Sequence, residues 1–168
     1  RPWDKLIMSS GIYRYGPRWI ASVPEGNQVD VLEKLHEKRR ILWYKESRES
    51  VVTVMNTVGT DERFIAVNGK GEASNTRDIM SQKLASHIPL CIHPDPRSAF
   101  VLGWGSGSTA GTASLYPLEK LQCAEIEPAM FEARQWFSGI NFDVDKTPIL
   151  QMTFNDGRNA LLVSPVRF

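Results

Sequence analysis

Three glycines alternate with other residues directly after a short apolar run. The run is 99–102, and Gly103, Gly105 and Gly107 follow it, with small, helix-compatible residues from Ser108 onward. Because glycine lacks a Cβ, a chain can turn tightly there and its backbone can approach a ligand. A helix that begins after such a turn presents free N–H groups to that ligand. The pattern predicts the first strand–turn–helix of a nucleotide or nucleoside site.

Two acids stand where later apolar runs end. Glu125 follows Gly103 by about 20 residues, the spacing at which an acid on the next strand accepts hydrogen bonds from two ribose hydroxyls. Asp156 ends the third run and could accept from an adenine amino group, with Gly157 leaving room for the base. We expect the turn, Glu125 and Asp156 to converge on one crevice, since the carboxyl ends of parallel strands share an edge.

Each feature also has a simpler interpretation when taken alone. The glycines could form only a tight strand–helix connection, Glu125 a solvated strand end, and Asp156 with Gly157 an ordinary turn. Their order and spacing together favour ligand binding. Trp104, between the glycines, could equally cover a ligand or pack beneath the turn.

The glycine spacing bears on the kind of ligand. A dinucleotide fingerprint would place its third glycine at position 108, which is Ser108, whereas the glycine falls at Gly107. This tighter spacing argues against a pyrophosphate and suits a nucleoside with a small charged tail, such as S-adenosylmethionine.

Other chemistries lack support in the sequence. His36, His87 and His93 have no cysteine or carboxylate at metal-ligand spacing, so we expect no metal site, and His87 is expected to be a packed or capping histidine. Ser106 does not lie in a nucleophile elbow, and neither a serine nor a cysteine nucleophile is indicated.

Composition excludes further classes of function. The 168 residues include 20 Lys+Arg and 19 Asp+Glu, so we expect no nucleic-acid partner, and no apolar run is long enough for a membrane span. Cys91 and Cys123 lie in apolar contexts and are predicted to be buried thiols of a reduced compartment, the cytoplasm. A start at Arg1, without Met or a signal segment, indicates a piece of a longer protein.

The first part of the chain, 1–94, is predicted to be a helix followed by an antiparallel β-meander. Residues 1–22, rich in aromatics, are expected to be irregular or short strands that pack on something else, such as a partner subunit. The remaining expectations are a turn at 24–27, a helix over 29–40 with Val29, Leu32 and His36 on one face, strands at 41–46, 51–58 and 63–67, a hairpin turn at Asn68-Gly69, a meander extending to 74, and a helix over 76–90 with Ile79, Leu84 and Ile88 inward and Pro89 at its end.

The second part, 95–168, follows the stiff linker 94–96 and alternates strands with helices. Strands are predicted at 99–102, 120–126 and 149–154, and helices at 109–115 and 128–137. This order predicts the first half of a Rossmann-like parallel sheet, so the fold class is α/β with a small antiparallel meander before it. A three-stranded sheet has an open edge, which also indicates a fragment.

From about residue 41 to Phe168, the sequence resembles the spermidine/spermine synthase (polyamine aminopropyltransferase) family, and in particular its bacterial branch often fused to membrane or transporter-like segments. The resemblance is carried by the meander, the glycine turn and the segments 82–90, 93–96, 125–128 and 155–159. It implies an N-terminal β-domain used in homo-oligomerisation. It also implies a methyltransferase-type domain that binds decarboxylated S-adenosylmethionine or methylthioadenosine and transfers an aminopropyl group to a small amine.

Residue by residue, the resemblance assigns Glu125 to the ribose and Asp156 with Gly157 to the adenine, and it matches the glycine turn. Two positions depart from the family. Gln82 stands where a histidine is usual at the substrate site, and Ser106 stands where an aspartate contacts the amine tail, so a charge partner for a cationic tail is lost. The catalytic aspartate implied by the family belongs beyond Phe168.

Two alternatives remain on the same scaffold. One is an S-adenosylmethionine-dependent methyltransferase, because the glycine turn and the ribose acid serve both reactions. The other is a non-catalytic domain whose meander and aromatic N-terminal segment serve assembly.

Overall fold

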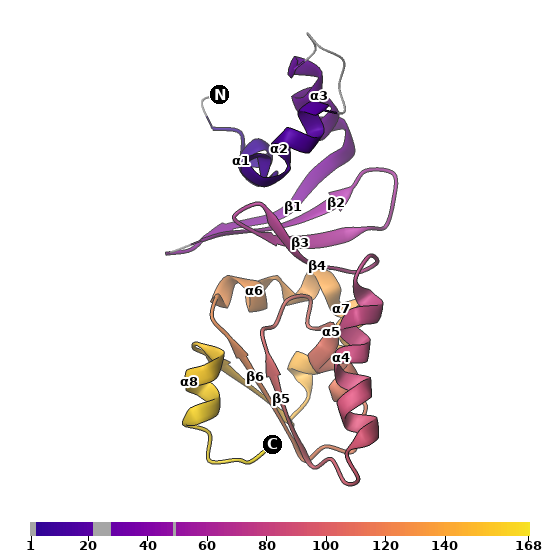
Figure 1. The fold of residues 1–168 in the computed structure, drawn as a ribbon, viewed down its shortest axis with the longest axis vertical. Coiled ribbons are helices and arrows are strands. Elements are labelled where there is room, and N and C mark those ends of the chain that lie inside the picture. The colour runs from indigo at the N-terminus through magenta and orange to yellow at the C-terminus, as the bar shows by residue number, and fades with distance from the viewer. Residues whose placement is uncertain (1–2, 22–27, 49) are drawn as a thin grey trace. The chain divides into compact units, whose positions relative to one another are not determined.

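The computed structural model describes residues 3–21, 28–48 and 50–168, with the side chains of 28–32 left out, so the predicted turn at 24–27 lies outside it. The chain divides into two compact units, 1–72 and 73–168 (Figure 1). The sequence placed the boundary at the proline linker 94–96, whereas the units divide before the helix α4 (Ile79–Ile92).

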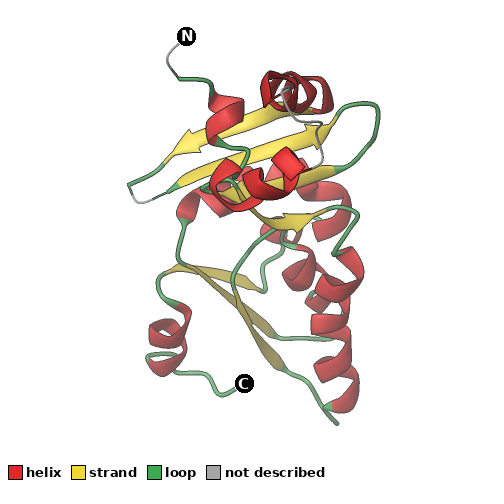
Figure 2. Cartoon of the chain, turned by 45° about the horizontal axis from the view of Figure 1, so that its top comes forward, coloured by secondary structure: helices red, strands yellow, loops and turns green. Residues whose placement is uncertain are grey.

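The first unit is built on an antiparallel meander, as predicted (Figure 2). Its strands are β1 (Arg39–Glu46), β2 (Val51–Thr57), β3 (Arg63–Val67) and β4 (Lys70–Ser74), in that order across the sheet. Asn68 and Gly69 have φ angles of 49° and 77°, the positive values that the predicted hairpin turn needs.

Helices precede the sheet where the sequence predicted irregular chain or short strands, so that expectation is wrong. The structure has α1 (Lys5–Met8) and α2 (Ile12–Ala21). Asp4 begins α1 by accepting hydrogen bonds from the backbone N–H groups of the second and third helical residues, at 2.8 and 3.1 Å. In α2 the aromatic residues lie at helical spacing, since Tyr15 and Trp19 stack with ring centroids 5.9 Å apart.

The helix α3 (Gln28–Lys38) leads into β1. It was predicted to run to residue 40 with His36 on its inner face, but the buried residue is the neighbouring Leu35, and His36 is exposed. The His36 ring instead contacts the carboxylate of Asp4 at 2.8 Å. Leu35 packs with Leu6, Met55 and Ala66, so α1 and α3 cover one face of the sheet.

The second unit contains the predicted parallel sheet. It consists of β5 (Ser98–Leu102), β6 (Lys120–Glu125) and β7 (Leu150–Phe154) in the order β5-β6-β7, and both pairings are parallel. Between the strands lie α5 (Ser108–Ala113), α6 (Pro128–Glu132), the 3₁₀ helix η1 (Ala133–Phe137), α7 (Ser138–Asn141) and the 3₁₀ helix η2 (Val144–Lys146), and α8 (Gly157–Leu162) follows β7. Figure 1 shows α4 and α8 on opposite sides of this sheet.

The inner face of α4 differs from the prediction. Leu84 and Ile88 are 44% and 54% exposed, whereas Ser86 and Leu90 are buried. The reason is close packing on α5, a helix of small residues, because the Ser86 hydroxyl donates a hydrogen bond to the carbonyl of Thr109 at 2.6 Å. Within the part of the chain that the structure describes, no helix is long and apolar enough to cross a membrane.

Candidate functional site

The glycine turn connects β5 to α5 with backbone angles that other residues rarely adopt. Gly103, Gly105 and Gly107 have φ angles of 87°, 57° and 79°. Gly107 is the residue before α5, and a Cβ there would lie 2.5 Å from the Trp104 ring. The turn therefore requires glycine both for its conformation and for its packing.

Trp104 packs beneath the turn, which decides between the two roles that the sequence left open. Its side chain is 3% exposed, and its ring meets that of Phe131 edge to face with centroids 4.9 Å apart. The ring belongs to the core cluster of the unit, together with Val101 and Leu121. Trp104 thus supports the turn from below rather than covering a ligand.

Glu125 ends the central strand and is held in place by two backbone groups. One carboxylate oxygen accepts a hydrogen bond from the N–H of Trp104 at 2.7 Å, and the other accepts from the N–H of Glu127 at 2.8 Å. The residue is 6% exposed. Each carboxylate oxygen can accept a second hydrogen bond, so the group retains capacity for two hydroxyl donors.

Asp156 follows the third strand and is exposed. It precedes α8 and accepts a hydrogen bond from the N–H of Asn159 at 3.0 Å, as a helix cap does. The N–H of Asn155 donates to the carbonyl of Glu125 at 3.1 Å, which joins the ends of β6 and β7. A Cβ at Gly157 would lie 2.7 Å from the exposed side chain of Leu102, so the ends of the outer strands also approach each other.

Ser106 and Gln82, which differ from the residues that the resemblance implied, contact each other directly. The Ser106 hydroxyl donates a hydrogen bond to the amide oxygen of Gln82 and accepts one from the N–H of Ser108 at 3.2 Å. The Gln82 amide nitrogen donates to the carbonyl of Ser74 at 3.3 Å, and the Thr109 hydroxyl donates to the carbonyl of Gln82 at 3.0 Å. Sequence reasoning had named both residues but had no means of predicting their contact.

The two cysteines differ, and the prediction that both are buried is wrong for Cys91. Cys91 is exposed on α4 because it lies on the outer side of the helix, where its sulfur is 3.1 Å from the Tyr116 hydroxyl. The same hydroxyl lies 2.7 Å from Nδ1 of His87, which is therefore a packed histidine. Burial, with the charge of Glu125 as a smaller cause, raises the pKa of the Cys123 thiol to about 12.

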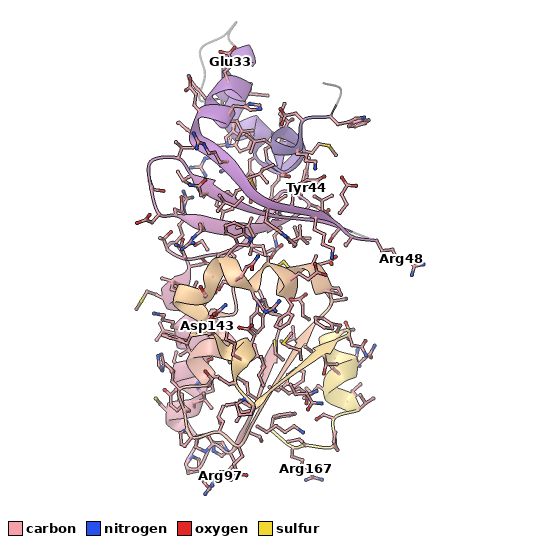
Figure 3. The ribbon with its side chains drawn as sticks, turned by 180° about the vertical axis from the view of Figure 1, so that it is seen from behind. Glu33, Tyr44, Arg48, Arg97, Asp143 and Arg167 are labelled. Carbon is pink, nitrogen blue, oxygen red and sulfur yellow. The ribbon has the colours of Figure 1, made fainter. Side chains whose placement is uncertain are left out.

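A cavity of about 660 Å³ lies between α4 and β5 and reaches the start of the glycine turn. Its lining includes Pro89, Leu90, Phe100 and Gly103, but neither Glu125 nor Asp156. Arg97 and Arg167 also line the cavity, at the end of the unit where Figure 3 labels both. Among the described residues, no group of three His, Cys, Asp or Glu side chains could hold a metal ion.

The chain is similar to known proteins over part of its length. No family model matches the chain. A polyamine aminopropyltransferase of Streptococcus pneumoniae is 30% identical over 101 residues, which are 59% of this chain and 35% of that protein. One from Nitrosomonas europaea is 30% identical over 98 residues, which are 57% and 30% of the two chains, and a spermidine synthase of Dictyostelium discoideum is 26% identical over 125 residues, which are 71% and 41%.

Solved structures show the same fold. A crystal structure of spermidine synthase from Thermotoga maritima matches with a TM-score of 0.65 and 18% identity, and it covers 73% of this chain and 43% of that one. A structure of spermidine synthase in complex with the transition state analogue AdoDATO matches with the same values. The chain spans 35% of the length of the Streptococcus pneumoniae relative. Over the stretch that it shares with them, the chain is similar in sequence to polyamine aminopropyltransferases and has the fold of spermidine synthase.

Proposed function

We propose that this chain is the nucleoside-binding part of a polyamine aminopropyltransferase. It binds decarboxylated S-adenosylmethionine and the product methylthioadenosine and serves transfer of the aminopropyl group to a small amine. The observation that carries the proposal is Glu125, a carboxylate fixed at the sheet edge by two backbone N–H groups and left with two free acceptor positions. Two adjacent ribose hydroxyls supply the matching pair of donors.

The sheet order supports the proposal because it arranges polar groups in the order in which a nucleoside presents its own. Asp156 lies just beyond β7, Glu125 ends β6, and the glycine turn with Ser106 follows β5. Neighbouring strands of a sheet lie about 4.8 Å apart. With adenine at Asp156 and ribose at Glu125, the 5′ substituent points toward the glycine turn.

The proposed reaction is a displacement at carbon. The amine nitrogen attacks the propyl carbon next to the sulfonium, a C–N bond forms, and the C–S bond breaks with its electron pair going to sulfur. The sulfonium becomes the neutral thioether of methylthioadenosine, and the proton of the amine passes to a base. Glu125 and Asp156 contribute by holding the donor in position.

An S-adenosylmethionine-dependent methyltransferase is the second candidate. It is favoured by the uncharged contact between Ser106 and Gln82, because no carboxylate is found there to prefer an aminopropyl tail. For either reaction we propose action in the cytoplasm as a homo-oligomer. The exposed apolar side chains of the first unit, Trp3, Met8 and Tyr13, support the assembly.

Calorimetric titration of the purified protein with methylthioadenosine tests the proposal. We expect saturable binding, and we expect it to be lost in Glu125→Ala and weakened at least tenfold in Glu125→Gln. Glu119→Ala is the matched control, because Glu119 lies at the opposite end of β6 and makes an exposed ion pair with Arg97 at 2.8 Å. Circular dichroism confirms that each variant is folded. Absence of binding to the folded wild type, or unchanged affinity in both Glu125 variants, would refute the proposed function.

A further inference from the structure

The contact between Ser106 and Gln82 is an uncharged plug at one end of the candidate site. Ser106 is fully buried, and its hydroxyl is covered by the amide of Gln82, which is itself half-buried. The amide is further held by its hydrogen bond to Ser74, and the backbone behind it by the hydroxyl of Thr109. A ligand that reaches this end therefore meets a neutral, immobilised amide.

This end is where the 5′ substituent of a nucleoside would lie. That statement rests on the proposed function, which places adenine at Asp156 and ribose at Glu125. The next position along the carboxyl edge is the end of β5, at the glycine turn. Ser106 lies in that turn between Gly105 and Gly107, and α4 brings Gln82 onto it.

The charged groups closest in sequence on α4 are of opposite sign and both have partners. Asp78, one helical turn before Gln82, accepts hydrogen bonds from the N–H and the hydroxyl of Ser74 at 2.8 and 2.5 Å. Lys83, the next residue, has its ammonium 5.8 Å from the centroid of the Phe142 ring. The nearest charged residues in sequence on either side of Gln82 are therefore one acid and one base, each with a partner of its own.

We propose that the Ser106–Gln82 plug forms an uncharged tail subsite and that the chain selects adenine nucleosides carrying a 5′-thioether by their nucleoside and sulfur alone. A cationic tail gives up part of its hydration on entering the site and gains no ion pair with the plug in return. Methylthioadenosine, which is neutral, therefore binds at least as tightly as its aminopropyl sulfonium. Residues 82 and 106 are the positions that determine this specificity.

Calorimetric titration of the whole protein with methylthioadenosine and with decarboxylated S-adenosylmethionine, at low and at high salt, tests this proposal. In the wild type we expect a dissociation constant for methylthioadenosine equal to or below that of the sulfonium, with a ratio that salt does not change. Gln82→Glu keeps the shape of the side chain and an acceptor for Ser106, gives up the donor to the Ser74 carbonyl, and adds one negative charge. It should tighten the sulfonium about fivefold at low salt, leave methylthioadenosine within twofold, and lose the gain at high salt.

Gln151→Glu is the matched control. Gln151 is exposed near the amino end of β7, so the same change of charge there should leave both affinities unchanged. A wild type that binds the sulfonium at least tenfold more tightly, with a preference that falls at high salt and in Asp78→Asn, would overturn the proposal and assign the tail to Asp78. The comparison of the two nucleosides on the wild type tests the proposal even if a variant fails to fold. Failure of both nucleosides to bind would refute the proposed function itself, and the tail subsite with it.

Discussion

Two acids at the carboxyl end of the parallel sheet, Glu125 on the central strand and Asp156 after the outer strand β7, differ in their burial and in their hydrogen-bond partners. At the centre, Glu125 is 6% exposed and joins the glycine turn to the start of the next helix through the N–H groups of Trp104 and Glu127. At the outer end, Asp156 is exposed and caps the short helix α8. The two carboxylates therefore resemble each other in sequence position but differ in how much of the fold depends on them.

Because of this difference, changes at the two acids should affect ligand binding and the free energy of unfolding to different extents. A change at the centre removes part of the support of the turn and the candidate ribose contact together. A change at the outer end costs at most a helix cap and leaves the sheet intact. Variants along the edge should therefore form a graded series in the free energy of unfolding.

The largest effect is expected where the centre depends on close backbone packing. Gly111→Ala would place a Cβ 2.2 Å from the carbonyl oxygen of Asn141, a residue whose amide supports the glycine turn by donating to the carbonyl of Ser106 at 3.4 Å. Because the obstacle is backbone, the segment must shift, and we expect a loss of about 3 kcal/mol or more in unfolding free energy. Urea denaturation measures it.

Gly139→Ala is the control for that variant. Gly139 also lies in a helix, α7, but a Cβ there would meet nothing within 4 Å. Alanine should leave stability unchanged or raise it by about 0.5 kcal/mol, since it lowers the entropy of the unfolded chain. Equal destabilisation by both variants would mean that α5 does not pack closely on α7.

Replacement of the central acid should have the next largest effect. Glu125→Gln retains the shape but offers one carbonyl oxygen for two backbone N–H groups, so one donor is left buried and unpaired. We expect a loss of about 2 kcal/mol in urea denaturation, and more for Glu125→Ala. A change below about 0.5 kcal/mol in both would show that Trp104 and Glu127 do not need this carboxylate, and the comparison with Asp156 would fail.

Parts of this arrangement could be predicted from the sequence because they depend on local rules. Strand periodicity and the spacing of glycines and acids placed Gly103, Glu125 and Asp156 at the carboxyl edge of a parallel sheet. The hairpin at Asn68-Gly69 followed from the positive φ angles that it needs. The binding roles of these residues stay predictions.

Tertiary packing accounts for what was missed. The contact between Ser106 and Gln82 joins residues on separate elements, and nothing in their spacing indicates it. On α4 the apolar residues Leu84 and Ile88 predicted the wrong inner face, because small residues let two helices approach closely and Ser86 takes the buried position. In α2 aromatic and basic residues are mixed, so the sequence lacks a clear apolar stripe with helical period. The stacking of Tyr15 on Trp19, four residues apart, shows the helical spacing in the structure.

The smallest change in stability is expected at the outer end, where two variants separate the cap from the ligand contact. Asp156→Ala removes the acceptor for the Asn159 N–H and should cost about 1 kcal/mol, whereas Asp156→Ser retains a capping oxygen and should cost a few tenths of that. Both remove the carboxylate proposed to accept from the adenine amino group, so both should weaken methylthioadenosine binding about tenfold in calorimetry. Unchanged affinity in Asp156→Ser would limit Asp156 to the role of a helix cap and would remove the acceptor proposed for the adenine amino group. The ribose contact would not be affected by that result, because it is tested separately by the Glu125 variants.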